Sequence, residues 1–469
     1  MNLKIQNIQI AADDPFRNDL LNRKTEVENL SALICNVNSP AVLAIDSAWG
    51  TGKTTFIKMW ENSLKKQDIK SLYFNAWATD FSDDPLVSFL GEMNDGLDDL
   101  IGLSAESKDA WAKTKTVGKQ LAKRGLPALI KIATAGVIDA EKIIEDEASK
   151  TMEALTGDAL ENYFKQKTAI KDFHDALKKS ISQSPGGKPV VIFVDELDRC
   201  RPTYAISLLE RIKHLFDIEG LVFVLSLDKT QLGHSIGAVY GEGIDSVSYL
   251  RRFIDFEYQL RRPDVVPYIK SLFGALSLDK YLEPRSKYDE LRYDKEHLEK
   301  VFIMLAQYQN LSLREIEQLL AGINLALRTA KENEYIDPAL LSFLVVAKNK
   351  RPELYRRYVS PSESETEMIA YLYEFMPETD RHENFECALV EGFLIAAKRD
   401  WRKKDISETL AHHNEISTDA AATHEEKSYS EQVINIATRP RGMRNGVDLA
   451  KLVERIEMLS QFQFEKDGR

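Results

Sequence analysis

The sequence predicts an α/β protein built on a mainly parallel five-stranded core, with a long helical insertion, a helical lid and a mostly helical C-terminal region. Two observations predict the sheet. Short and almost continuously apolar runs recur along the first 260 residues, and segments with helical spacing separate most of them. Strands that are buried on both faces have this composition, and intervening helices are typical of parallel connections.

The expected elements follow in chain order. Residues 15–36 have apolar side chains close to helical spacing and are expected to be helical. The first apolar run leads into a glycine-containing turn and then into a helix that begins near Thr54. The five expected strands are residues 41–45, 70–75, 190–194, 221–227 and 253–260.

Longer segments surround this pattern. Residues 95–182 are mostly helical in pattern, highly charged and far longer than an ordinary connection between strands. The polar segment 399–432 has few large apolar residues and is expected to be a linker or loop. We therefore expect a core over residues 1–264 with its insertion at about 95–182, a helical lid over 265–345 and a partner-binding C-terminal region over 346–469.

The composition is typical of a soluble globular protein. The chain has 469 residues, of which 43% are hydrophobic and 29% charged, and a net charge of −12. This acidity weakens the case for a general nucleic-acid coat but leaves room for a local basic face. Three distant cysteines without metal-binding spacing predict a reducing, cytoplasmic setting. The most membrane-like run, residues 126–138, is short and contains Lys131, so no membrane span is expected.

The strongest motif lies between the first strand and the helix that follows it. Residues 47–55 nearly match the phosphate-binding pattern GxxxxGK(S/T), with Ser47 in place of the first glycine. Glycines let backbone N–H groups approach phosphate oxygens, and the helix N-terminus favours negative charge. We expect Lys53 to contact the terminal phosphates and the Thr54 hydroxyl to bind Mg²⁺. The expected nucleotide-binding residues are Ser47, Trp49, Gly50, Thr51, Gly52, Lys53, Thr54 and Thr55.

A second motif ends the third expected strand. The apolar run Val190–Val194 is followed directly by Asp195 and Glu196. An acidic pair at this point, together with an upstream phosphate loop, is typical of an ATPase. Asp195 is expected to hold Mg²⁺, and Glu196 to polarise the attacking water. Asp198 has two possible roles, as another acid of the site or as a structural partner of Arg199.

Four stretches of the chain together resemble the KAP family of phosphate-loop NTPases. The resemblance spans roughly residues 15–345 and implies an additional-strand NTPase core related to the AAA+ and STAND groups, with a helical lid. Members often carry membrane helices between the two nucleotide motifs, whereas the corresponding insertion here holds only the run 126–138. The stretches, in family order, are residues 18–56, Tyr73–Trp77, Val194–Pro202 with the helix after it, and Phe223–Asp228 followed by Tyr249–Phe253.

The resemblance also implies residues that assist at the phosphates. Ser226 or Asp228, after the fourth strand, is similar to the polar sensor position that orients water near the terminal phosphate. Arg314, at the start of a helix, is similar to a lid arginine that reaches phosphate. The alternative for Arg314 is a surface charge that pairs with a neighbouring acid such as Glu317.

Two further arginine positions carry implied roles. Arg251 and Arg252 precede the fifth strand, as arginines supplied to a neighbouring subunit do in AAA+-like assemblies, and a solvated basic pair is the alternative. Such arginines accelerate hydrolysis by up to about 10³–10⁵ where they operate. Arg23, with Asn22, lies beside the adenine or forms a simple helix cap.

Other residues have ordinary structural explanations. Trp49 and Trp77 are expected to be core residues rather than stacking platforms. Cys200 is expected to be a small buried residue rather than a nucleophile. His412 and His413 have no third ligand at suitable spacing and are expected on the surface.

The motifs and the resemblance together predict a Mg²⁺-dependent nucleoside triphosphatase that uses ATP or GTP and acts as a conformational switch. An oligomer of identical chains and a separate protein effector are the expected partners, and the resemblance makes a role in prokaryotic anti-phage defence plausible. One alternative is a nucleotide-gated scaffold with little turnover. Another is a nucleic-acid-stimulated sensor, for which the basic runs 398–404 and 439–444 are candidate surfaces.

Overall fold

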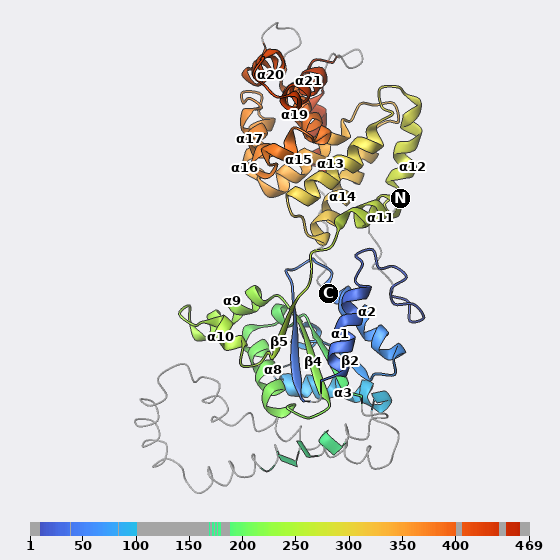
Figure 1. The fold of residues 1–469 in the computed structure, drawn as a ribbon, viewed down its shortest axis with the longest axis vertical. Coiled ribbons are helices and arrows are strands. Elements are labelled where there is room, and N and C mark those ends of the chain that lie inside the picture. Colours follow the sequence, from blue (N-terminus) through green and yellow to red (C-terminus); the bar gives the residue numbers. More distant parts are fainter. Residues whose placement is uncertain are drawn as a thin grey trace. The chain divides into compact units, whose positions relative to one another are not determined.

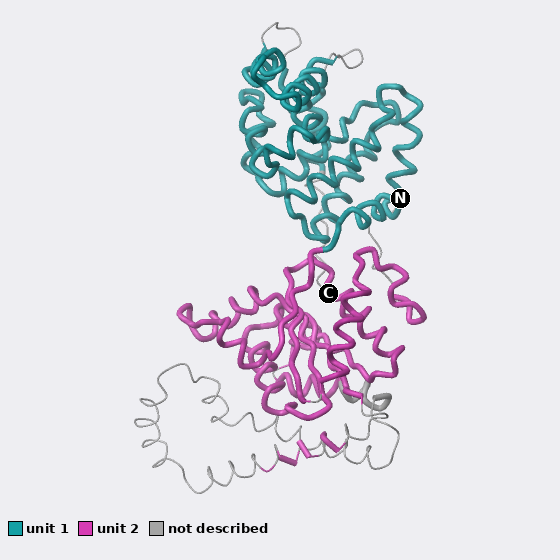
Figure 2. Tube along the Cα trace, viewed as in Figure 1, with its two compact units in different colours: residues 1–7, 263–469 teal, residues 8–262 magenta. Residues whose placement is uncertain are grey.

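The computed structural model describes residues 10–37, 39–82, 84–100, parts of 168–179, 188–399, 406–439 and 447–459. These residues form two compact units, one described within residues 8–262 and the other from residue 263 onward (Figure 2). Most of the expected insertion, the apolar run 126–138 and most of both basic runs lie outside the described residues. None of the described helices is both long and apolar enough to cross a bilayer.

The first unit is built on a parallel five-stranded sheet, as the sequence predicts. In spatial order the strands are β2, β3, β4, β1 and β5 (Figure 1). Every neighbouring pair is parallel. The strands are β1 (Ala41–Asp46), β2 (Ser71–Asn75), β3 (Val190–Asp195), β4 (Leu221–Leu227) and β5 (Phe256–Gln259).

Helices cover both faces of this sheet (Figure 1). One face packs against α1 (Lys24–Cys35) and α2 (Lys53–Lys66), and Trp60 of α2 lies edge-on to Phe193 of β3. The other face packs against α8, α9, α10 and the start of α3, around a cluster of Phe74, Phe89 and Phe223. The bounds of these helices are α3 (Pro85–Leu100), α8 (Pro202–Leu215), α9 (Lys229–Tyr240) and α10 (Ser246–Leu250).

Two element boundaries differ from the sequence-based expectation. The helix expected over 15–36 begins only at Lys24, because Asn22 takes a positive φ of 55° and turns precede it. The fifth strand is shorter than 253–260, since Phe253 belongs to the turn after α10 and pairing with β1 starts only at Phe256.

The second unit is entirely helical in its described residues. It contains both the segment expected as a lid and the segment expected as the C-terminal region, and α15 runs across residue 345. Its helices are α11 (Val265–Ala275), α12 (Leu278–Leu282), α13 (Asp294–Tyr308), α14 (Leu313–Arg328), α15 (Pro338–Lys350), α16 (Pro352–Val359), α17 (Thr366–Phe375), α18 (Glu378–Arg381), α19 (Phe385–Lys398), α20 (Glu408–Thr418), α21 (His424–Thr438) and α22 (Leu449–Leu459).

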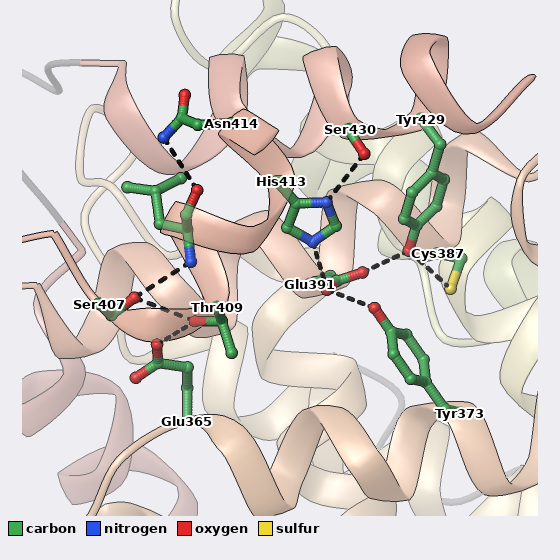
Figure 3. Close-up of polar contacts among 11 residues, drawn as sticks. Glu365, Tyr373, Cys387, Glu391, Ser407, Thr409, His413, Asn414, Tyr429 and Ser430 are labelled. Atoms are coloured by element: carbon green, nitrogen blue, oxygen red, sulfur yellow. Dashed lines mark hydrogen bonds and ion pairs between the residues drawn. The ribbon is translucent and has the colours of Figure 1, made fainter. Parts of the chain in front are cut away.

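The prediction of a linker or loop over residues 399–432 is wrong. Its described part forms α20 and the first half of α21, which pack against each other, and α21 packs on α19. A buried polar network helps to join them (Figure 3). The carboxylate of Glu391, 1% exposed, accepts hydrogen bonds from the Tyr373 and Tyr429 hydroxyls and lies 2.8 Å from Nε2 of His413. Polar rather than apolar contacts at these positions hid the helices from a search for apolar spacing.

The surface position expected for the two histidines holds for His412 only. His413 is 4% exposed, and its Nδ1 lies 3.1 Å from the Ser430 hydroxyl (Figure 3). Both ring nitrogens of His413 therefore have a partner, which satisfies the polar groups of a buried imidazole.

Candidate functional site

The loop between β1 and α2 has the backbone conformation that its glycines permit. Gly50 and Gly52 have φ values of 76° and 90°, in the left-handed region that side chains disfavour. Ser47, at the position of the usual first glycine, is not among the positive-φ residues, and its hydroxyl bonds the Thr51 hydroxyl at 2.8 Å. A serine is therefore tolerated at this position.

Lys53, the first residue of α2, lies within this loop. Its ammonium donates to the backbone oxygens of Ser47 and Ala48. Burial lowers the pKa of Lys53, and the carboxylates of Asp198, Asp228, Asp195 and Asp46 oppose that shift. The four carboxylates therefore favour the charged form of the ammonium, which burial disfavours.

The carboxyl ends of three strands lie in register beside the loop. Asn75 of β2 pairs with Asp195 of β3, and Asp195 pairs with Ser226 of β4. Asp195 is 1% exposed, and its Oδ2 accepts a hydrogen bond from the Tyr73 hydroxyl at 3.0 Å. Burial and the nearby Asp195 raise the pKa of Tyr73, so the phenol remains a donor at neutral pH.

Glu196 follows directly and is held at both carboxylate oxygens. Its backbone is left-handed, with φ of 60°, which turns the chain sharply at the end of β3. The Asn75 side-chain amide donates to Oε2 at 3.0 Å, and the Arg199 guanidinium lies 2.8 Å from Oε1. The Glu196 side chain is 14% exposed, so it lies at the rim of the site.

The short 3₁₀ helix η3 (Leu197–Arg199) ties the loop to the sheet. Oδ2 of Asp198 accepts from the Trp49 indole at 2.5 Å and from the backbone N–H of Asp228 at 3.0 Å. Arg199 pairs with Glu196 instead. Asp198 is therefore not the ion-pair partner of Arg199 and connects the loop to the end of β4.

This chain matches a known protein family. The KAP family P-loop domain matches residues 23–330, which is more than half of the sequence. The chain belongs to the KAP family. This membership supports nucleotide binding at the loop that contains Lys53. No curated protein matches the chain.

Three solved structures resemble this KAP-family chain distantly. The Aeropyrum pernix ORC2 protein with ADPNP and ADP is 14% identical, with a TM-score of 0.34 over 94% of both chains. The Pyrobaculum aerophilum Cdc6p protein is 12% identical, with a TM-score of 0.35 over 97% of this chain and 90% of that one. The Aeropyrum pernix ORC1 protein in complex with DNA is 13% identical, with a TM-score of 0.32 over 95% and 94%. These low scores carry no argument about this chain.

The two sensor candidates of this KAP-family chain differ in what their side chains contact. Asp228 caps α9, because its Oδ1 accepts from the backbone N–H groups of Thr230 and Gln231. Ser226 is fully buried, and its hydroxyl has no partner among the described residues. Ser226 is therefore the candidate with a hydroxyl to spare.

Arg23 is 3% exposed and precedes α1 as its N-cap residue. Its Nη1 donates to Glu26 at 2.7 Å and to the backbone oxygen of Arg261 at 2.8 Å, while Nη2 has no partner among the described residues. The side chain thus joins α1 to the segment after β5. These contacts fit a structural role for Arg23, and its Nη2 group has no partner among the described residues.

The other expected arginines come from elements other than the phosphate loop and the end of β3. Arg252 is half-buried in the turn between α10 and β5, with its guanidinium 5.9 Å from the Tyr249 ring centre, and Arg251 is exposed. Arg314 is exposed in the first turn of α14, in the second unit. The suggested partner of Arg314, Glu317, instead accepts a hydrogen bond from Tyr268.

The prediction that both tryptophans are core residues is wrong. Trp49 is 48% and Trp77 44% exposed. The indole N–H of Trp49 binds Asp198, and the Arg199 guanidinium lies 5.7 Å from the Trp77 ring centre. These polar and cationic contacts hold both rings in partly exposed positions. Cys200 is 5% exposed and burial raises its pKa, which agrees with the expected inert buried residue.

The oxygen donors of this KAP-family chain fit a magnesium ion. Mg²⁺ prefers hard oxygen ligands and is usually held by one or two carboxylates together with substrate phosphates and water. Asp195 provides a carboxylate at the end of β3, and Thr54 provides a hydroxyl in the first turn of α2. Across the described residues no cluster of three or more His, Cys, Asp or Glu side chains is arranged to enclose a metal, which suits a site completed by phosphates.

Sequence reasoning assigned no role to the donors that hold the acidic pair. Tyr73 and Asn75 are two residues apart on β2, so their side chains share one face, and each binds one of the two acids. That alternation was readable in the sequence, but the register between β2 and β3 was not. Arg199 was considered only as a partner of Asp198.

Proposed function

We propose that this chain is a Mg²⁺-dependent nucleoside triphosphatase, with ATP as the first substrate to test. The observation that carries the proposal is the convergence of two motifs at the carboxyl edge of one parallel sheet. The loop with Lys53 follows β1, and the acidic pair Asp195 and Glu196 ends β3. Ligands of open α/β sheets bind at this edge.

Each residue has a chemical task in this proposal. Backbone N–H groups of residues 50–55 and the ammonium of Lys53 balance the negative charge of the phosphates. Thr54 and Asp195 would hold Mg²⁺, which supplies further charge neutralisation when bound. Glu196 accepts a proton from the attacking water, and Ser226 orients that water by hydrogen bonding.

The same proposal extends to the use of the hydrolysis cycle. Nucleotide state changes the second unit through Arg314, and a second copy of the chain contributes Arg252 or Arg251 to a neighbouring site. A partner protein then responds to the assembled state, and the family makes defence against phage a biological setting to test. Exposure of Arg251 and Arg314 supports these roles, since both side chains are accessible to another surface.

A nucleotide-gated scaffold is the second candidate. The engagement of both Glu196 oxygens favours it, because a carboxylate that is fully hydrogen-bonded accepts a water proton poorly. In that case nucleotide binding, and not turnover, controls the partner.

Phosphate release separates the two candidates. We would measure it for the wild-type chain and for Glu196→Gln, with Mg²⁺ and ATP or GTP, with and without DNA, and follow mass in solution. Hydrolysis that the substitution abolishes supports the triphosphatase. Tight ATP binding without hydrolysis, in both proteins and under all conditions, contradicts the triphosphatase and favours the scaffold.

A further inference from the structure

The proposed general base, Glu196, is restrained by an arginine from its own turn. Arg199 lies three residues further along, at the end of η3, and its guanidinium is 2.8 Å from Oε1 of Glu196. The Asn75 amide occupies Oε2. A base in water activation needs a free lone pair that points at the water, and both oxygens of Glu196 are occupied here.

The contact is placed where it can open. The Arg199 side chain is 31% exposed, and Trp77, on whose ring it lies, is 44% exposed. Partly exposed ion pairs are weak, because water and ions compete with them. Asn75 is neutral and lies on a strand. Of the two contacts, the Arg199 pair is therefore the one that neutralises the carboxylate, and the Arg199 side chain is the one that can move away.

We propose that Arg199 is a positioning residue that holds Glu196 in a restrained state, and that its release from Oε1 frees the base for hydrolysis. The inference rests on the proposed triphosphatase function and names a control of that same site. Trp77 shares the control, since the Arg199 guanidinium lies 5.7 Å from the centre of its ring. The restraint makes slow basal turnover a property built into the turn after β3.

The charged and titratable neighbours leave Arg199 as the cation of this pair. Asp195 precedes Glu196 on β3, and the groups of Tyr73 on β2 and Cys200 after η3 also interact electrostatically with Glu196. Burial raises the pKa of both Tyr73 and Cys200, so these two stay neutral at working pH. Among these neighbours, Arg199 is therefore the group whose removal leaves Oε1 of Glu196 open.

The test compares steady-state ATP hydrolysis by the full chain with that by Arg199→Ala and Arg199→Lys. We expect kcat to rise by about fivefold in Arg199→Ala, the shift that opening a partly exposed pair allows, and KM to change little. A rise in kcat at nearly constant KM distinguishes release of the base from a change in nucleotide binding. Arg199→Lys keeps the charge and should fall between the two.

Arg201→Ala is the matched control. Arg201 lies two residues beyond Arg199 and pairs with Asp80 at 2.9 Å rather than with Glu196, so its loss should leave kcat unchanged. The double variant Glu196→Gln with Arg199→Ala should be as inactive as Glu196→Gln alone. This result would show that the gain in turnover acts through Glu196. Thermal unfolding of every variant checks that each is folded.

The possible failures are distinguishable. Hydrolysis by the wild type with an equal or lower kcat in folded Arg199→Ala would overturn the restraint and leave the triphosphatase intact. A rise in kcat that persists in the double variant would overturn the route through Glu196. Absence of hydrolysis in wild type and Arg199→Ala alike, with ATP bound, would remove the proposed function and this inference with it.

Discussion

Two clusters of polar side chains in this protein contain similar residues but differ in what they do. At the edge of the sheet, Glu196 is part-exposed and the Ser226 hydroxyl has no partner among the described residues. In the second unit, Glu391 is 1% exposed and is bound by two tyrosines and a histidine (Figure 3). The buried Glu391 network fixes how helices pack, whereas the pair of Glu196 with Arg199 is partly exposed and can open beside the phosphate loop.

The difference teaches which acidic residues to suspect. Burial and a strong set of partners are as evident at Glu391 as at any catalytic carboxylate, and a search for unusual acids alone would select both. A partly exposed partner and a position beside a phosphate loop separate Glu196 from Glu391. The predictions below test this separation, because changes at the sheet edge should alter chemistry and changes at the network should alter stability.

The largest expected effect is on turnover. Lys53→Met removes the cation of the loop, and we expect hydrolysis to fall by about 10²–10³, as when a single electrostatic contact to the reacting group is lost. Lys65→Met is the control, since Lys65 lies on the same helix but pairs with Glu61 on the surface. Both are measured by phosphate release, and equal losses in the two variants would contradict a special role for Lys53.

The next effect is on stability. His413→Ala leaves the buried Glu391 carboxylate without its histidine partner, and the loss of one hydrogen-bond partner of a buried group costs about 1–3 kcal/mol. The neighbouring His412 is exposed, so His412→Ala should cost less than about 0.5 kcal/mol. Urea unfolding compares the two, and a similar small loss for both would mean that the network contributes nothing.

Acid should weaken the same network. Burial raises the pKa of Glu391, but contacts from His413, Tyr373 and Tyr429 outweigh it and leave the pKa below the ordinary 4.5. A carboxyl group with a lowered pKa stabilises the fold above its unfolded pKa, and this stabilisation is lost as pH falls through the folded value. Unfolding measured from pH 7 downward should therefore show a loss below about pH 4.5 that is smaller in Glu391→Gln. Identical acid profiles would refute it.

A smaller effect is expected at Asp195, the proposed metal ligand. Tyr73→Phe removes the hydrogen bond to Asp195, a contact worth about 1 kcal/mol, so the Mg²⁺ concentration for half-maximal hydrolysis should rise by about fivefold. Tyr204→Phe also loses one buried hydroxyl, bonded to Thr79, and should not change the Mg²⁺ dependence. A shift of equal size in both variants would indicate a general loss of packing.

Much of the first unit was predictable because its signals are local. Apolar runs and the glycine spacing after β1 depend on neighbouring residues, and the five strands and the loop follow from them. The contacts of the acidic pair were not predictable, since Tyr73, Asn75 and Arg199 reach the carboxylates only through strand register and the left-handed turn at Glu196.

The helices α20 and α21 show the other limit. Their segment has few large apolar residues, and its buried positions include His413 and Ser430, which sequence patterns assign to the surface. His413 becomes compatible with burial because Glu391, from a different helix, partners its Nε2, and His413 in turn partners the Ser430 hydroxyl. Long-range polar complementarity of this kind leaves no periodic trace in the sequence.

The most direct test of the central claim measures two properties in two variants. Glu196→Gln and Glu391→Gln make the same chemical change at the two clusters, and ATP turnover per folded molecule and urea unfolding are measured for each. The account predicts that Glu196→Gln loses turnover by about 10² or more with little change in stability. It predicts that Glu391→Gln loses stability while turnover per folded molecule stays near that of the wild type. Lost turnover in folded Glu391→Gln, or full turnover in Glu196→Gln, would contradict the assignment of chemistry to the sheet edge.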